Sequence, residues 1–200
     1  MNKKLIIGII IFVVIIGGLG GYFVLKGKNS NSVNEDINNE ENNTENNIAI
    51  VYFSATGNTE KVAEYINLNV GGDLIQIIPK EEYTEEDLDY NTDNTRASNE
   101  QNDSAARPEI ENSIELSSYD TIFLGYPIWW GDVPKIILTF LDNTDLSGKT
   151  VIPFCTSGGS GIETSVETLR NYNSNINFID GKRLEVSQNA VNDWLSTLKY

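Results

Sequence analysis

The chain has 200 residues and a formal net charge of −15, with 29 acidic and 14 basic side chains. We expect no binding to nucleic acid, because contact with a phosphate backbone needs a surplus of Lys and Arg. The sequence contains no histidine, which excludes histidine-based acid–base catalysis and argues against most transition-metal sites.

The first element along the chain is an uncharged run of 21 residues, Leu5–Leu25. As a helix rising 1.5 Å per residue, it would span the roughly 30 Å hydrocarbon core of a bilayer. The alternative is a cleaved secretory signal, which has a shorter apolar region and a cleavage site of small residues such as alanine. No alanine precedes Ala49, so we expect a retained transmembrane anchor over residues 1–28.

The orientation of this anchor rests on its flanking charges. Two lysines precede the apolar run and two follow it, so the positive-inside rule alone does not decide the orientation. These lysines are Lys3, Lys4, Lys26 and Lys28. The N-terminal amine and the usual signal-anchor arrangement favour an internal N-terminus, which predicts a membrane-anchored domain outside the cytoplasm.

A polar linker is predicted over residues 29–47, where nine of nineteen residues are Asn and five are acidic. Such a segment cannot bury a core, so we expect it to be disordered. All 29 acidic residues follow Lys28, together with ten of the fourteen basic ones. An acidic surface suits docking to a basic protein partner, although a plain solvated face explains it as well. The lone cysteine, Cys155, leaves the redox compartment open.

Five apolar runs in residues 48–200 predict the strands of one domain. They are Ile48–Phe53, Leu74–Ile78, Thr121–Leu124, Thr150–Cys155 and Ile176–Ile179. Several are continuous and rich in β-branched residues, which is typical of strands buried on both faces of a parallel sheet. Because Pro153 cannot donate a ladder hydrogen bond, we expect a bulge or an early end in the fourth strand.

Apolar residues at helical spacing lie between these strands and predict amphipathic helices. The stripes are Val62, Ile66 and Val70; Ile136, Ile137, Phe140 and Leu141; Ile162, Val166 and Leu169; and Val191, Trp194, Leu195 and Leu198. Alternation of strand and helix predicts an α/β doubly wound fold, because parallel neighbours require crossover connections that normally carry helices.

The connection Pro79–Ser118 is polar and much longer than an ordinary connection. We expect a short helix around Thr95–Asp103. Loops of this size are usually functional or disordered, and a functional one would act as a lid. Four of its residues could then cover a ligand: Tyr83, Tyr90, Arg96 and Arg107.

The first motif joins the first strand to the first helix and consists of Ser54, Ala55, Thr56, Gly57, Asn58 and Thr59. Backbone amides and the positive end of the helix dipole converge on such a loop, and its hydroxyls add donors, so it predicts a phosphate site. It is not a P-loop, because no Gly-Lys-Ser/Thr follows. A plain N-cap turn is the alternative reading.

The second motif follows the third strand and contains Tyr126, Pro127, Ile128, Trp129 and Trp130. Paired tryptophans at the carboxyl end of a strand present flat faces to a crevice, so we favour ligand stacking over core packing for both.

The third motif follows the fourth strand and begins with Thr156, Ser157, Gly158 and Gly159. Alone it is only a Gly-rich loop. Together, the three loops follow strands one, three and four, and ligands of open α/β sheets bind at the carboxyl edge where strand order reverses.

Three segments, IVYFSATGNTEKVAEYI, YDTIFLGYPIWWGDVPKIILTFL and GKTVIPFCTSGGSGI, resemble the flavodoxin family, and the resemblance covers most of residues 48–200. It implies a five-stranded parallel sheet of order 2-1-3-4-5 with helices on both faces, and FMN as the cofactor. It further implies that Ser54, Thr56, Gly57, Asn58 and Thr59 hold the FMN phosphate. Residues 127–130 and 156–159 would flank the isoalloxazine ring.

The second motif departs from the small flavodoxins, since Trp130-Gly131 stands where many of them have an aspartate-rich loop. It also resembles the aromatic loop of flavodoxin-like quinone reductases, which however employ a histidine. We expect an electron carrier that serves redox partner proteins or small acceptors, with a low potential because the excess of carboxylates disfavours a reduced flavin anion. The alternatives are an NAD(P)H-dependent flavin or quinone reductase and a binding module that has lost flavin.

Overall fold

The computed structural model describes residues 47–199. The expected anchor at residues 1–28, and the expected linker up to residue 46, lie outside the described residues. Within residues 47–199, no helix is both long and apolar enough to cross a bilayer.

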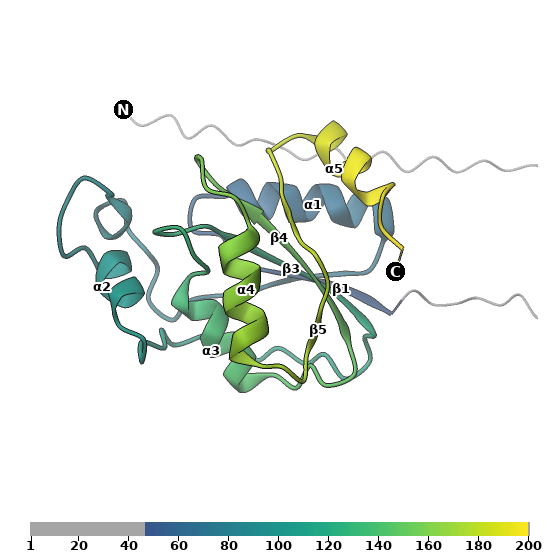
Figure 1. Cartoon of the computed structure of the whole chain (residues 1–200), viewed down its shortest axis with the longest axis horizontal. Coiled ribbons are helices and arrows are strands. Elements are labelled where there is room, and N and C mark those ends of the chain that lie inside the picture. The colour runs from purple at the N-terminus through teal and green to yellow at the C-terminus, as the bar shows by residue number, and fades with distance from the viewer. Residues whose placement is uncertain (1–46, 200) are drawn as a thin grey trace, which may run out of the picture. The chain divides into compact units, whose positions relative to one another are not determined.

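Strands and helices alternate along the described chain (Figure 1). The strands are β1 (Ile48–Tyr52), β2 (Asp73–Gln76), β3 (Thr121–Pro127), β4 (Thr150–Thr156), β5 (Asn177–Phe178) and β6 (Lys182–Arg183). The helices are α1 (Asn58–Val70), α2 (Arg96–Asn102), α3 (Lys135–Asn143), α4 (Glu163–Tyr172) and α5 (Gln188–Leu195), with one 3-10 turn, η1 (Glu86–Leu88). The short helix expected around Thr95–Asp103 is confirmed as α2, which Thr95 caps by accepting a hydrogen bond from the Ser98 amide.

All six strands pair in parallel: five follow the order β2-β1-β3-β4-β5, and β6 also pairs with β4. The predicted α/β class and strand order are therefore confirmed. The register aligns Ile50 of β1 with Phe123 of β3, and Phe123 with Ile152 of β4. This alignment brings the carboxyl ends of the three central strands, and the loops that follow them, to one edge of the sheet.

Successive residues of the central strands belong to two apolar cores, one on each face of the sheet. Ala49 and Val51 pack in the core that contains residues of α3 and α4. Ile48 and Ile50 pack in the core that contains residues of α1 and α5. Figure 1 shows the two helix layers on opposite sides of the strands. Burial on both faces explains why these strands read as continuous apolar runs.

The expectation of a bulge or early end at Pro153 is wrong, because β4 continues to Thr156 and Pro153 aligns with Leu124 of β3. On the side of β4 that faces away from β3, the carbonyls of Val151 and Cys155 accept hydrogen bonds from the amides of Ile179 and Leu184. Since strand residues alternate in direction, Pro153 faces that same side. Pairing there is interrupted, because β5 aligns with residues 150 and 151 and β6 with residues 154 and 155.

The strand expected over Ile176–Ile179 is found as the shorter β5, and a second short strand that the sequence did not predict, β6, follows it beside β4. Between them the backbone of Gly181 approaches Pro153 so closely that a Cβ would lie 2.6 Å from the Pro153 carbonyl oxygen. The backbone nitrogen of Pro153, which carries no hydrogen, thus faces the gap between β5 and β6. No ladder hydrogen bond is required there.

The outer side of β2 is covered by the return of the long connection between β2 and β3. The Asn112 side-chain amide donates to the Gln76 carbonyl at 2.8 Å, and its oxygen accepts from the Ile78 amide at 2.9 Å. These are the two groups that one residue of a parallel neighbouring strand would bind. Asn112 therefore replaces a strand residue at the edge of the sheet.

Candidate functional site

The loops that follow β1, β3 and β4 surround a cavity of about 540 Å³ at the carboxyl edge of the sheet. This volume lies within the usual range for small-molecule sites. Eight residues of the three sequence motifs line it: Thr56, Asn58, Pro127, Ile128, Trp129, Thr156, Ser157 and Gly158. The structure therefore brings all three predicted loops to one cavity.

Thr156 holds these loops together. Its hydroxyl lies 2.8 Å from the Thr59 hydroxyl, and its carbonyl accepts a hydrogen bond from the Ile128 amide at 2.9 Å. Thr59 is 1% and Thr156 7% exposed, so the hydroxyl pair is shielded from water. Each loop is thus fixed relative to the other two by a direct hydrogen bond to one residue.

The loop after β1 has the features of an anion site. The Ser54 hydroxyl is buried and has no hydrogen-bond partner among the described residues, which is rare for a group that costs free energy to desolvate. Gly57 adopts φ 81° just before α1 begins, and no atom lies within 4 Å of where its Cβ would be. Thr56 and Asn58, which hydrogen-bond to each other, border the cavity. A phosphate group would accept a hydrogen bond from the Ser54 hydroxyl, and its negative charge would be stabilised by the positive end of the α1 helix dipole.

The loop after β3 contains a tight turn, Trp129–Asp132, which we call the Trp turn. The amides and carbonyls of Trp129 and Asp132 are joined by two hydrogen bonds of 3.0 Å. The central residues Trp130 and Gly131 have φ 47° and 83°, as in a type I′ turn. A tryptophan rarely adopts positive φ, and such strain is usually found at functional sites. The Asp132 carboxylate accepts from the Thr168 hydroxyl of α4, which anchors the turn.

The two tryptophans have different surroundings. Trp129 is 5% exposed and packs edge to face against Phe53 and Tyr83, although it also borders the cavity. Trp130 is 38% exposed and stacks on Tyr90, with the ring centroids 4.4 Å apart. Trp129 therefore both packs in the core and lines the cavity. Trp130 does not line the cavity and contacts Tyr90, which does.

Several predicted site residues do not line this cavity: Ser54, Ala55, Gly57, Thr59, Tyr126, Trp130 and Gly159. Tyr126 lies furthest from the expected role, because its side chain is fully buried and its hydroxyl lies 3.1 Å from the Ser165 hydroxyl. Burial raises the pKa of the Tyr126 phenol well above its usual range. Side chains of one strand alternate between faces, so Tyr126 points into the core below α4.

The four residues expected in a lid have separate locations. Tyr90 borders the cavity and its hydroxyl donates to the Ile128 carbonyl at 3.3 Å. Tyr83 and Arg96 contact each other away from the cavity lining. Arg107 pairs with Asp142 of α3 at 2.8 Å. Of the four, only Tyr90 is placed to cover a ligand.

The model of the flavodoxin family described as Flavodoxin_4 matches residues 47–198. The chain belongs to the flavodoxin family. No curated protein matches it significantly.

Solved structures with similar chains include proteins described as flavoproteins. A candidate flavoprotein from Bacteroides eggerthii is 44% identical, with a TM-score of 0.71, and the match covers 74% of this chain and 95% of that one. A candidate flavoprotein from Bacteroides uniformis is 39% identical with a TM-score of 0.73, covering 75% and 97%. A flavoprotein from Lactobacillus acidophilus, solved in complex with FMN, is 26% identical with a TM-score of 0.58, covering 74% and 97%.

In this flavodoxin-family member, five lining residues lie outside the three sequence motifs: Leu88, Tyr90, Leu184, Glu185 and Val186. Val186 is an apolar residue that stays 46% exposed at the cavity, but exposure is a property of the folded chain, so sequence reasoning had no signal for it. Leu184 is held in place by the hydrogen bond from its amide to the Cys155 carbonyl. The segment that directly follows β6 therefore adds three residues to the wall of the cavity.

Proposed function

We propose that this chain binds one FMN noncovalently and transfers electrons at the carboxyl edge of its sheet. The observation that carries the proposal is the buried Ser54 hydroxyl, which has no hydrogen-bond partner within residues 47–199, beside a cavity formed by the loops of the three sequence motifs. The FMN-bound relative from Lactobacillus acidophilus supports the choice of ligand.

The residues of the chain suit the two ends of FMN. Ser54, Thr56 and Asn58 would hold the phosphate together with the first amides of α1, because these donors favour a dianion. Pro127, Ile128 and Tyr90 would contact the planar ring. Gly158 and Gly159 leave open space where a Cβ would stand, so the ring can approach the backbone there. Bound FMN would supply the redox chemistry, while the protein orients the ring and excludes water from it.

The direct test is titration of purified, flavin-free full-length protein with FMN, followed by flavin fluorescence and visible absorbance. We expect quenching with one equivalent bound and a shifted absorbance band. Riboflavin, which lacks the phosphate, should bind far more weakly. A protein that neither takes up FMN nor perturbs its spectrum would contradict the proposal and favour a binding module without flavin.

A second measurement separates a carrier from an NAD(P)H-dependent reductase. Potentiometric titration gives about 59 mV per tenfold change in the ratio of oxidised to reduced protein for one-electron steps, and about 30 mV for a two-electron step. We expect the one-electron steps of a carrier, and we expect the potential to be low because the acidic domain disfavours added negative charge. A two-electron slope with rapid oxidation of NADPH would support the reductase instead.

We further propose that residues 1–28 anchor the domain to a membrane, with the domain outside the cytoplasm and the polar linker between them. The uncharged run Leu5–Leu25 supports the anchor. The electron partners would be proteins with basic docking surfaces or small acceptors. Protease treatment of intact cells tests the orientation, since an outward domain is digested and an inward domain is protected.

A further inference from the structure

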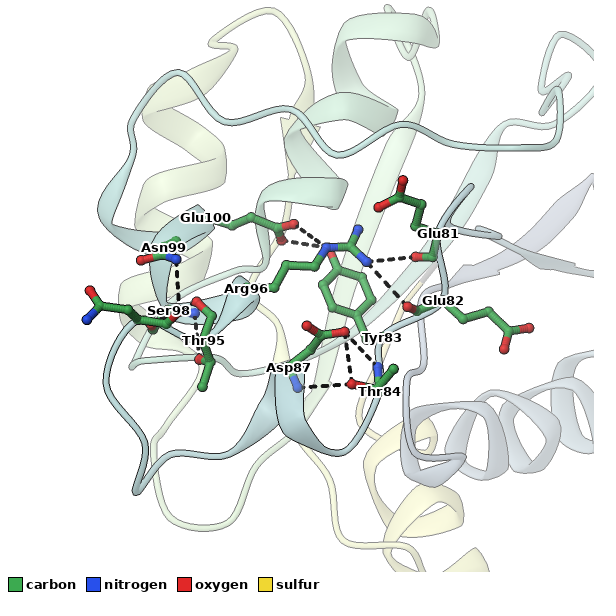
Figure 2. A network of polar contacts seen from close by, with 11 residues as sticks. Glu81, Glu82, Tyr83, Thr84, Asp87, Thr95, Arg96, Ser98, Asn99 and Glu100 are labelled. Atoms are coloured by element: carbon green, nitrogen blue, oxygen red, sulfur yellow. Dashed lines mark hydrogen bonds and ion pairs between the residues drawn. The ribbon is translucent and has the colours of Figure 1, made fainter.

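A cluster of three side chains lies in the connection between β2 and β3, outside the cavity lining (Figure 2). The guanidinium carbon of Arg96 lies 4.0 Å from the centre of the Tyr83 ring. Arg96 Nε donates to Glu100 Oε1 at 2.9 Å, and the Tyr83 hydroxyl donates to Glu100 Oε2 at 2.7 Å. Arg96 thereby fixes both the ring and the carboxylate that its hydroxyl contacts.

Arg96 also binds the backbone that precedes Tyr83. Its Nη1 donates to the carbonyls of Glu81 and Glu82 at 3.0 and 3.3 Å (Figure 2). The side chains of Arg96 and Glu100 are 24% and 15% exposed, so solvent screens this ion pair less than a surface pair. Burial, and after it the hydrogen bond to Glu100, raises the pKa of the Tyr83 phenol, which stays neutral.

The cluster reaches the cavity through aromatic contacts. The Tyr83 ring lies edge to face against Trp129, with centroids 4.8 Å apart, and against Phe53 at 5.7 Å. Trp129 borders the cavity, and Phe53 directly precedes Ser54 of the phosphate loop. Displacement of the Tyr83 ring would therefore disturb both the ring end and the phosphate end of the site.

Gln101, which follows Glu100 on α2, makes a second connection. Its Nε2 donates to the Trp129 carbonyl at 3.0 Å and to the Val133 carbonyl at 3.3 Å. These carbonyls lie at the start of the Trp turn and just after its end. A turn with a tryptophan at φ 47° persists only if its surroundings hold it, and Gln101 supplies two such contacts.

We propose that Arg96 and Gln101 are positioning residues of the FMN site, Arg96 acting on Trp129 through Tyr83 and Gln101 acting on the Trp turn directly. The inference rests on the proposed function, because it assigns these residues to the cavity proposed to hold FMN. It extends the site into a connection that none of the three sequence motifs includes.

The test compares Arg96→Met with Arg107→Met in full-length protein. Arg107 is a matched control, because it also pairs with a carboxylate, donates to two backbone carbonyls and lies over a tyrosine ring, that of Tyr172. It contacts α3 and α4 rather than Trp129. We expect Arg96→Met to raise the Kd for FMN about fivefold and Arg107→Met to leave it unchanged within twofold, since coupling between contacting residues is of this size.

Four further tests distinguish positioning from general stability. Arg96→Met should alter the near-ultraviolet circular dichroism of the FMN-free protein, where the Tyr83–Trp129 contact absorbs, and should shift the midpoint potential. Arg96→Lys should restore part of the affinity. In a Trp129→Phe background, Arg96→Met should cost less affinity than in the wild type, because the path through Trp129 is already altered.

The outcomes separate the two proposals. If the wild type binds FMN, and Arg96→Met and Gln101→Leu match Arg107→Met in affinity, potential and dichroism, the positioning role is wrong and the proposed function stands. If the wild type itself fails to bind FMN, the proposed function is wrong and the positioning role falls with it. Should Arg96→Met not fold, Arg96→Lys compared with Arg107→Lys carries the test of Arg96, and an affinity unchanged in Arg96→Lys would contradict its role; Gln101→Leu tests the second contact by itself, because it removes only the hydrogen bonds to the Trp turn.

Discussion

The hydroxyl oxygens of Thr59 and Thr156 lie 2.8 Å apart, although 97 positions separate the two residues in the chain. Thr59 is the last residue of the first motif and lies in the first turn of α1, and Thr156 ends β4 and begins the third motif. This single contact joins the proposed phosphate end of the site to the Gly-rich loop.

Replacing one partner of this pair should cost more stability than replacing both. We expect Thr156→Val to lower the free energy of unfolding by about 1–3 kcal/mol, because it leaves the buried Thr59 hydroxyl without a partner. The double variant Thr59→Val/Thr156→Val should recover much of that loss. Urea unfolding of the wild type, the single variant and the double variant measures these free energies. Thr139→Val serves as the control, since the Thr139 hydroxyl only meets the Lys135 carbonyl of its own helix, and a cost as large as that of Thr156→Val would contradict the prediction.

Ser54→Ala should separate ligand affinity from stability. The Ser54 hydroxyl has no hydrogen-bond partner among residues 47–199, so its removal should not lower the stability of the flavin-free protein. The affinity for FMN should fall about tenfold, because a hydrogen bond to a charged phosphate is worth about 1.5–3 kcal/mol. Riboflavin should bind both proteins equally. An unchanged Kd for FMN in Ser54→Ala would remove Ser54 from the phosphate site.

The stability of the protein should fall in alkaline solution through Cys155. Burial, as the largest cause, raises the pKa of this thiol from its ordinary 9.0 to about 12. Because the pKa is higher in the folded state than in the unfolded state, the thiol contributes to the free energy of unfolding. This contribution is fully present below pH 9 and is lost as the pH rises towards 12. The slope approaches about 1.4 kcal/mol per pH unit for one proton. Unfolding by urea between pH 8 and 10 should show this loss in the wild type and in Val151→Ala, but not in Cys155→Ala.

Glu185 should lower the redox potential of bound FMN, because its carboxylate borders the cavity. We expect Glu185→Gln to raise the midpoint potential by about 20 mV, the effect of one charge several ångströms away in a partly solvated site. The difference should shrink at high salt, since exposed charges are screened. Glu115→Gln, whose side chain lines a different cavity, should leave the potential unchanged.

The central strands and the place of the site could be predicted from sequence because burial on both faces leaves a direct signature. β1, β3 and β4 are continuous apolar runs, and the motifs that follow them must meet at one edge of a parallel sheet. The break between β5 and β6 could not be predicted in this way. It depends on Pro153 of a neighbouring strand and on its close approach to Gly181.

Aromatic residues of the site were harder to assign. Trp129 and Trp130 are adjacent and chemically identical, so composition cannot separate them. Their difference arises from the positive φ of Trp130, which directs its ring to Tyr90, while Trp129 turns towards Phe53 and Tyr83. The position of Tyr90 at the cavity depends on the path of the forty-residue connection Pro79–Ser118, and local sequence patterns do not determine that path.

Asn112 has a consequence for how the molecules behave at high concentration. An uncovered β2 would offer the Gln76 carbonyl and the Ile78 amide to the same strand of another copy, and bare strands of this kind promote aggregation. The Asn112 side chain occupies both groups. The Asn112 side chain therefore makes these two groups unavailable to a strand of another copy.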